Sequence, residues 1–153
     1  TREQIRAALT DGQAMACTLL GEAANQGIDG IVGVACVVRN RALAPRWWGR
    51  GYKGVCLAPA QFSCWWGTDA NSAAVYAAAE AMIARQPQGE RTILSEIHWV
   101  VAGIMGEALR DVTRGSDHYM TAALYYSPAR PAWASGKVPT RVVGAHVFFR
   151  LEL

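Results

Sequence analysis

Residues 12–28, GQAMACTLLGEAANQGI, form an apolar and small-residue stretch that contains one charged side chain, that of Glu22. The pattern predicts a buried helix, with Met15, Thr18 and Leu19 on the helical face that carries Glu22. A carboxyl group in such partly desolvated surroundings is favoured in its protonated form. Held in that form, it can act as a general acid. The alternative is a glutamate near a helix end whose carboxylate points into water.

The segments on either side of this stretch extend the helical pattern. Thr10 or Asp11 is expected to cap a helix over residues 11–25, and Asp29 to cap a second over residues 29–43. The second carries apolar residues at positions i, i+3, i+4 and i+7, and Arg39 and Arg41 give it a cationic end. The two helices are expected to pair as a hairpin. Further helices are expected over about 71–85 and 93–110, the latter with an apolar face.

Two other segments lack helical periodicity. Residues 45–67 carry four tryptophans among Gly and Pro residues, which predicts a long irregular loop with a functional role. Residues 116–126, SDHYMTAALYY, and residues 142–150, VVGAHVFFR, group β-branched and aromatic residues and predict short strands or a hairpin. The expected fold class is therefore α+β, mainly α-helical, with a small antiparallel β element near the C-terminus.

Composition limits the class of protein. The chain has 153 residues, of which 52% are hydrophobic, so a single domain over 1–153 with no second domain is expected. A net charge of +3 without any basic tract argues against nucleic acid as a partner and suits attraction to an anionic polymer. No apolar run is long enough to span a bilayer, so stable membrane insertion is not expected.

The four cysteines divide into two pairs. Cys17 and Cys36 lie in Ala- and Val-rich helical stretches and are expected to be buried small hydrophobes. Cys56 and Cys64 flank LAPAQFS and would close a loop as a disulfide in an oxidising compartment. The cysteines and the three histidines lack zinc-ligand spacing, so neither a metal nor another cofactor is expected.

Four motifs occur in order along the chain: LLGEAANQGIDGIVGVACVVRNR (19–41), VCLAPAQFSCW (55–65), GSDHYMTAALYYSPARPAW (115–133) and VVGAHVFFR (142–150). Together they resemble the spore-cortex-lytic, SleB/CwlJ-like family of cell wall hydrolases, which cleave the glycan strands of peptidoglycan. The variant with a cysteine-flanked QFS loop looks like that of bacteriophage endolysins. The family's fold resembles those of lysozyme and the lytic transglycosylases.

The resemblance assigns roles to individual residues. Glu22 matches the family's catalytic acid, while Gln61, Phe62 and Ser63 match the loop that lines the glycan groove. Gly115, His118 and Tyr119 match the segment that faces the glutamate, and Trp65 is added as a sugar-binding aromatic. Because successive strand residues alternate, one of His118 and Tyr119 is expected to face Glu22 and the other to pack against Val147 or Phe149. Ala24, Asn25 and Gln26 stand where the family often has Arg-Gly-Glu, so a second glutamate is missing.

The resemblance also implies a partner and a location. Peptidoglycan glycan strands are the expected partner of a monomeric enzyme acting at the bacterial cell wall, in the periplasm or outside the cell. A phage lysin would be made in the host cytoplasm and released through a holin.

The carboxylates constrain the mechanism. Glycoside hydrolysis by two carboxylates needs a partner for Glu22, and the candidates are Asp29, a helix cap, and Asp117, beside His118. A lytic transglycosylase needs one glutamate, which protonates the glycosidic oxygen and then deprotonates the muramyl C6 hydroxyl to give a 1,6-anhydro end. The sequence favours that mechanism, with hydrolysis by the same glutamate as the alternative.

The remaining polar and aromatic residues leave choices open. His146 either orients His118 or packs within the β element, and His98 is expected at the surface. About half of Trp47, Trp48, Trp65 and Trp66 are expected in the core and the others on sugar faces. Two further function classes stay open: a thiol amidase or peptidase that pairs Cys56 or Cys64 with a histidine, and a non-catalytic glycan-binding module.

Overall fold

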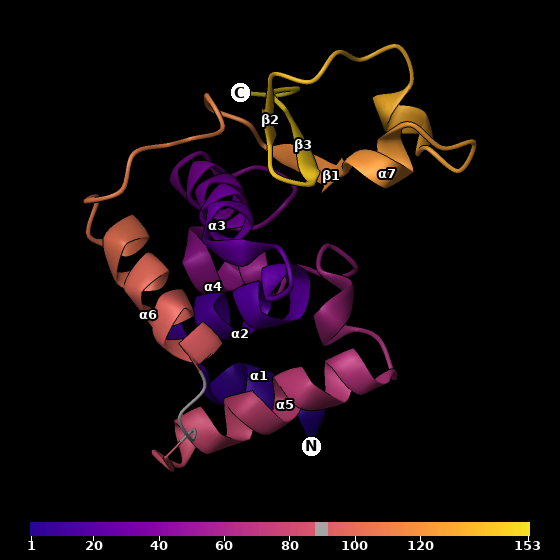
Figure 1. Cartoon of the computed structure of the whole chain (residues 1–153). Helices are drawn as coiled ribbons and strands as arrows, with labels where there is room; N and C mark the ends of the chain where they lie inside the picture. Colours follow the sequence, from indigo (N-terminus) through magenta and orange to yellow (C-terminus); the bar gives the residue numbers. More distant parts are fainter. Residues whose placement is uncertain (88–91) are drawn as a thin grey trace.

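A computed structural model describes residues 1–87 and 92–153 of the chain, and helices make up most of it (Figure 1). The helices are α1 (Arg2–Ala8), α2 (Asp11–Ala23), α3 (Gly27–Leu43), α4 (Gly51–Cys56), α5 (Ala70–Ile83), α6 (Thr92–Met105) and α7 (Ala122–Tyr125), with 3₁₀ turns η1 (Ser63–Trp65) and η2 (Ala132–Ala134). The strands are β1 (His118–Thr121), β2 (Arg141–Val143) and β3 (His146–Phe149). The predicted class, mainly α with a small antiparallel sheet near the C-terminus, is confirmed.

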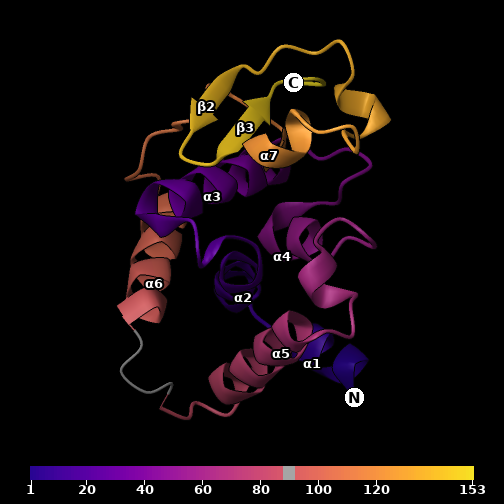
Figure 2. The same cartoon turned by 45° about the vertical axis from the view of Figure 1, so that its right-hand side comes forward.

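Helix α2 is the central element of the helical part. Thr10 caps it through a capping box in which its side chain accepts a hydrogen bond from the Gln13 N–H and the Gln13 side chain accepts one from the Thr10 N–H. Residues 14–19 are all buried, and α3, α4, α5 and α6 each contact the helix. Figure 2 shows α2 almost end-on among these four helices. The predicted burial of this stretch is confirmed.

The sheet lies at one end of the helical part, beside α3 (Figure 1). Its strand order is β1-β3-β2 with antiparallel pairing, and Tyr119 is opposite Phe148 in the register. Strand β3 is in the middle and all four of its residues are buried. His146 and Phe148 face α3, where they approach Gly30 and Gly33, while Val147 and Phe149 pack in a second cluster with Met120 and Ala134. A central strand covered on both faces joins the helical part to α7 and η2.

Several predicted element boundaries are wrong in instructive ways. Asp29 lies in the first turn of α3 rather than at its cap, since the helix already begins at Gly27. The region 45–67 contains α4 and η1 and is not wholly irregular. Helix α6 ends at Met105, short of the predicted residue 110, because Glu107 takes a left-handed conformation with φ 58°. Residues 122–125 form α7 and do not continue strand β1.

Other expectations concern single residues and the membrane. Cys17 and Cys36 are fully buried, as predicted. Of the four tryptophans in the loop region, Trp48 and Trp65 are buried and Trp47 and Trp66 are exposed, which confirms that half of them belong to the core. None of the helices in the described residues has both the length and the apolar character needed to cross a membrane.

Gly33 sets how closely the sheet approaches α3. A Cβ atom added at this position would lie 2.6 Å from the Phe148 Cζ atom, closer than real side chains come. We predict that Gly33→Ala lowers the free energy of unfolding by about 1–3 kcal/mol, because the Phe148 ring must move. Gly12→Ala is the control, since its added Cβ would meet its nearest neighbours at 3.9 Å. Urea denaturation measures both, and an equal effect of the two substitutions would contradict this packing account.

Candidate active site

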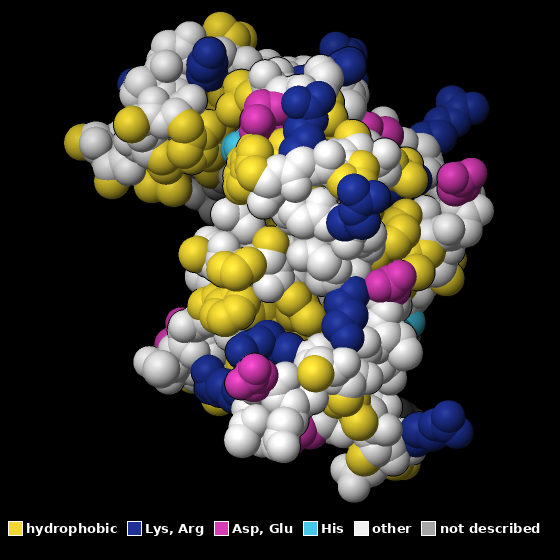
Figure 3. Space-filling view, turned by 180° about the vertical axis from the view of Figure 1, so that it is seen from behind, with side chains coloured by type: hydrophobic (Ala, Val, Ile, Leu, Met, Phe, Trp, Pro, Cys, Tyr) yellow, Lys and Arg dark blue, Asp and Glu magenta, His cyan; other side chains and the backbone are white. Residues whose placement is uncertain are grey.

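A cavity of about 510 Å³ opens between the sheet with α7 and the helical part. It is lined by Glu22 from α2, Arg41 from α3, Trp47, residues 60–62, residues 118–121 of β1, Leu124 from α7 and Trp133 from η2. Figure 3 shows this side of the molecule hollowed between two projecting parts, with hydrophobic side chains on both. The shape suits a chain-like ligand that enters along the hollow.

Glu22 is held from two segments that are distant in the sequence. The Cys64 backbone N–H donates to Oε1 and the Tyr119 hydroxyl donates to Oε2, each over 3.4 Å. These contacts are longer than ordinary hydrogen bonds, whose donor–acceptor distances are about 2.5–3.2 Å. Burial, then the charge of Glu22, raises the pKa of Tyr119 well above its usual value, so the phenol keeps its proton and donates it. The predicted contact between Glu22 and the 118–119 segment is therefore present, and it is made by Tyr119.

His118 and Tyr119 lie on opposite faces of β1, as strand alternation predicts. Tyr119 faces Glu22 and packs against His146 and Phe148. The member of the pair that does not face Glu22 is expected to pack against Val147 or Phe149, but the His118 ring instead lies 6.0 Å from that of Trp47 and 5.0 Å from that of Trp133. The difference arises because Trp133 itself covers Phe149, with the ring centroids 5.5 Å apart. His118 thus joins an aromatic wall of the cavity.

Asp117 fixes the orientation of His118 and binds the backbone of residues 151–153. Its buried carboxylate accepts hydrogen bonds from the backbone N–H groups of Leu151, Glu152 and Leu153 and contacts His118 Nδ1 over 2.8 Å. Burial alone would raise the pKa of Asp117, but these hydrogen bonds outweigh it and hold the pKa below the usual value. Because the carboxylate only accepts, Nδ1 of His118 carries a proton.

The second nitrogen of His118 faces the cavity. Nε2 makes no hydrogen bond within the described residues, where the buried side-chain polar atoms without a partner are Ser72 Oγ and His146 Nδ1. Nε2 is therefore accessible, and in the neutral imidazole it is a hydrogen-bond acceptor. His146 packs against Tyr119 and Phe148 and does not orient His118, and burial lowers its pKa. His98 is exposed, as expected.

The loop residues that the sequence analysis assigned to the glycan groove differ in whether they reach the cavity. Gln61 and Phe62 line the cavity, whereas Ser63 is exposed beside it. Trp65, expected to bind sugar, is 1% exposed and its indole N–H donates to the Thr18 hydroxyl over 2.9 Å. Its ring is thus part of the core beneath the loop, because the 3₁₀ turn η1 directs it inward against Tyr76.

The cysteines are free thiols. Cys56 and Cys64 are buried and form no disulfide in the structure, in contrast to the pairing considered for an oxidising compartment. Burial raises the pKa of the Cys56 thiol to about 12, and burial together with the charge of Glu22 raises that of Cys64 further. A thiol in this state supplies almost no thiolate at neutral pH, which disfavours a cysteine nucleophile.

Glu22 is the one carboxylate among the described residues that line the cavity. Asp29, considered as its partner, is exposed on the other side of α3 beside Val32 and residues 141–143. Asp117, the other candidate, has both oxygens occupied by backbone donors and His118. No group of three or more His, Cys, Asp or Glu side chains that could hold a metal ion occurs in residues 1–87 and 92–153.

Arg41 is a cavity residue that the sequence reasoning missed. It was interpreted only as part of the cationic end of its helix, yet it is 6% exposed and lines the cavity. The sequence does indicate its burial, because Arg41 continues the apolar stripe of Ile31, Val34 and Val38 at helical spacing. A charged residue on an apolar stripe is the same signal that identified Glu22.

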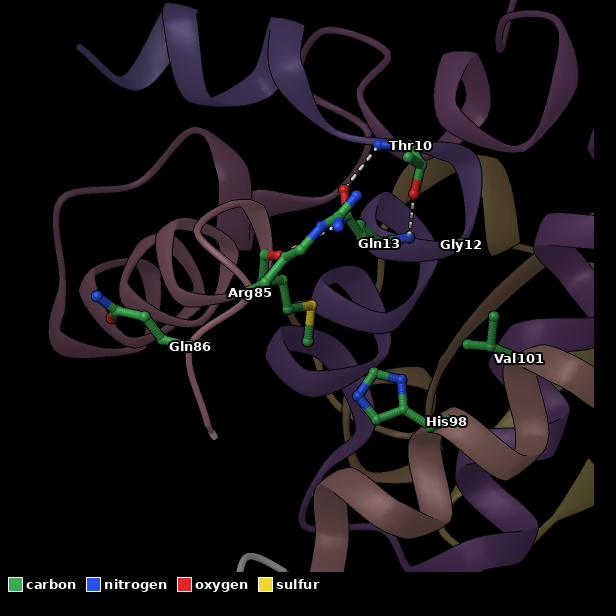
Figure 4. A pocket seen from close by; sticks show the side chains of 8 residues that line it. Thr10, Gly12, Gln13, Arg85, Gln86, His98 and Val101 are labelled. Carbon is green, nitrogen blue, oxygen red and sulfur yellow. Dashed lines mark hydrogen bonds between the residues drawn. The ribbon is translucent and has the colours of Figure 1, made fainter. Parts of the chain in front are cut away.

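A second hollow of about 430 Å³ lies between the start of α2, the end of α5 and α6 (Figure 4). Gln13 projects into it, but its side chain already accepts from the Thr10 N–H and donates to the Met82 carbonyl. His98 stands apart from these groups, and no carboxylate is among the described residues that line this hollow. Unlike the first cavity, this hollow has neither a carboxylate nor an aromatic wall among its described lining residues.

The family is established by comparison with known proteins. Residues 25–149 match the family model described as Cell Wall Hydrolase. The chain belongs to this family. The family is one of enzymes that act on peptidoglycan at the cell wall. The match begins after Glu22, so the role of that residue depends on the geometry above and on its motif. No curated protein and no solved structure matches the chain.

The hydrogen bonds of Asp117 generate a stability prediction. Asp117→Asn should lower the free energy of unfolding by about 2–4 kcal/mol at pH 7, because charge-assisted bonds are lost and an amide N–H₂ faces backbone donors. The pKa of Asp117 is lower in the folded than in the unfolded state, so its stabilisation is present above the unfolded value and is lost as pH falls through the folded one.

Denaturation of wild type and Asp117→Asn between pH 7 and pH 2 measures this difference. The difference in free energy of unfolding between the two proteins should be constant down to about pH 4 and should shrink below that pH. A gap that does not change over the whole range would show that the Asp117 charge contributes nothing.

Proposed function

We propose that this family member cleaves peptidoglycan glycan strands as a lytic transglycosylase, with Glu22 as acid and then base. The observation that carries the proposal is one carboxylate, Glu22, in an aromatic-walled cavity whose other described lining residues include no second carboxylate. Double-displacement hydrolysis would need another carboxyl group about 5–5.5 Å away. One carboxyl group is sufficient for transglycosylation.

The proton transfers follow from the two contacts of Glu22. Protonated Glu22 gives its proton to the glycosidic oxygen as the bond to the muramyl C1 breaks. The resulting carboxylate is stabilised by the Tyr119 hydroxyl and the Cys64 N–H. It then takes the proton of the muramyl C6 hydroxyl, whose oxygen bonds to C1. The enzyme returns to its first state, and the product carries a 1,6-anhydro end.

The walls of the cavity suit a sugar chain. Trp47 and Trp133 keep 57% and 39% of their surface exposed, and they flank His118. Sugars present apolar faces to aromatic rings and hydroxyl groups to polar side chains. Gln61 and Tyr119 supply the polar groups, and Phe62 lines the cavity beside Gln61. Ser63 follows in the sequence, is exposed and is not part of the cavity lining.

Hydrolysis is a second candidate because of the contact between Asp117 and His118. An imidazole whose Nδ1 is held by a buried carboxylate presents Nε2 as a base that can activate water. With Glu22 as acid, water would add to C1 and leave a reducing end. The two candidates therefore share the acid and differ in the product.

A bacteriophage lysin is the biological role that we propose for this activity. The support is the motif variant around Gln61 and His118. Expression in the periplasm of a Gram-negative bacterium should lyse the cells, whereas Glu22→Gln should not. Intact cells after periplasmic expression of active enzyme would contradict the lysin role.

Glu22→Gln should keep the fold and lower the rate of glycan cleavage by about 10²–10⁴, because the amide cannot donate a proton to the leaving oxygen. Turbidity of purified sacculi measures the rate, and thermal unfolding checks the fold. Glu80→Gln, an exposed position on α5, is the matched control and should clear sacculi as the wild type does. Clearing at the wild-type rate by folded Glu22→Gln would contradict the assignment.

The released fragments distinguish the candidates. Mass spectrometry should find muramyl ends that are lighter by one water than reducing ends, as expected for the anhydro product. Reducing ends would favour hydrolysis assisted by His118. Binding to sacculi with no fragments released would favour a non-catalytic module, and loss of activity on alkylation would favour a cysteine enzyme.

A further inference from the structure

Arg41 joins three parts of the cavity. Its Nε–H donates to the Asp117 carbonyl on the approach to β1 over 2.7 Å, and Nη1 donates to Gln61 Oε1 over 3.3 Å. The guanidinium also lies over the rings of Trp47 and Trp48, 5.7 and 5.4 Å from their centroids. Contacts to the segment before β1, to the loop that carries Gln61 and to two indoles fix its position.

Part of the guanidinium remains open. A guanidinium carries five N–H donors, and the described residues engage Nε and Nη1. Nη2 makes no hydrogen bond with them, and the buried side-chain atoms without a partner in the described chain are Ser72 Oγ and His146 Nδ1. Nη2 is therefore reached from the cavity that Arg41 lines.

The charge of Arg41 has no direct carboxylate partner in the described part of the chain. The contact of His118 with Asp117 is the one pair there within ion-pair distance. The Asp117 oxygens are occupied by backbone N–H groups, and the Glu152 carboxylate accepts from the Trp47 indole. Burial lowers the pKa of Arg41, and the charges of nearby Asp117 and Glu152 oppose this, so the side chain stays charged.

A fixed guanidinium with free donors is suited to a carboxylate. If the substrate is the glycan strand proposed above, its two sugars differ in one group. N-acetylmuramic acid carries a lactyl ether, which ends in a carboxylate or in a stem peptide, and N-acetylglucosamine carries none. An N-acetyl group is present on both sugars and gives no discrimination.

We propose that Arg41 is the residue that recognises the muramyl sugar, by binding a carboxylate that only this sugar carries. The carboxylate belongs either to the free lactyl group of a peptide-free strand or to the stem peptide. This inference rests on the proposed glycan substrate. It assigns to Arg41 the selection of muramyl over glucosaminyl chains and the placement of the muramyl ring beside Glu22.

Binding to the inactive Glu22→Gln protein tests this without any cleavage. The probes are chitin oligomers, peptide-free muramyl glycan and peptide-bearing muramyl glycan, each measured by calorimetry. Adding Arg41→Lys should weaken binding of the muramyl glycans about ten- to hundredfold and leave chitin binding unchanged. The muramyl probe with the larger loss identifies the source of the carboxylate.

Two further variants separate recognition from folding. Arg39→Lys changes a buried arginine of the same helix that donates to the Leu109 carbonyl away from the cavity, and it should leave all binding unchanged. Gln61→Glu keeps Arg41 and places a competing carboxylate beside it, so it should weaken binding of the muramyl glycans more than binding of chitin, to which Gln61 also contributes.

The inference is overturned if Arg41→Lys and Gln61→Glu leave muramyl binding unchanged, if they weaken chitin binding equally, or if Arg39→Lys gives the same loss. Failure of the proposed function appears elsewhere, in the products released by the wild type, because binding by the Glu22→Gln protein does not depend on how the bond is cleaved.

Discussion

The rest of the site depends on one carboxylate that is held between two hydrogen-bond donors from distant parts of the chain. Glu22 is on the central helix, Cys64 on the loop that precedes α5, and Tyr119 on the first strand of the sheet. Bringing them together requires the loop, the helix and the sheet to be in place at once. In the reaction proposed above Glu22 gives up a proton and becomes a carboxylate, and such preorganised donors stabilise it because no reorganisation is needed when the charge forms.

The fold supplies this arrangement through close packing around small residues. Gly21 lets the loop approach α2, since a Cβ there would lie 2.5 Å from that of Cys64. Gly33 lets Phe148 lie against α3, and Tyr119 pairs with Phe148 across the sheet. The donors of Glu22 are thus positioned by neighbours at which no side chain fits. Asp117 adds a separate restraint by binding backbone N–H groups of residues 151–153.

Much of this could be predicted from the sequence where a periodic pattern existed. Helices α2, α3, α5 and α6 have regular apolar spacing or caps, so their existence was predicted, although α6 ended early at a left-handed residue. Helix α1 and the short α4 were not predicted. Helix α1 has no buried residue, and α4 spans six residues within a segment rich in Gly and Trp. Neither is long enough for periodicity to show.

The site was predicted in part for the same physical reason. Glu22 was noticed because it interrupts an apolar helix, and Arg41 interrupts another but was taken for a helix-end charge. The inward orientation of Trp65 depends on its hydrogen bond to Thr18, and the wall formed by Trp47 and Trp133 depends on residues far apart in sequence. Such long-range pairings leave no trace in local spacing.

A crystal structure of Glu22→Gln with a bound muramyl oligosaccharide tests the central claim most directly. The account predicts a glycosidic oxygen within about 3.2 Å of the residue 22 side chain, which is hydrogen-bond distance, with the muramyl ring beside Trp47 and Trp133. An oligosaccharide bound with every glycosidic oxygen beyond the reach of residue 22 would contradict it.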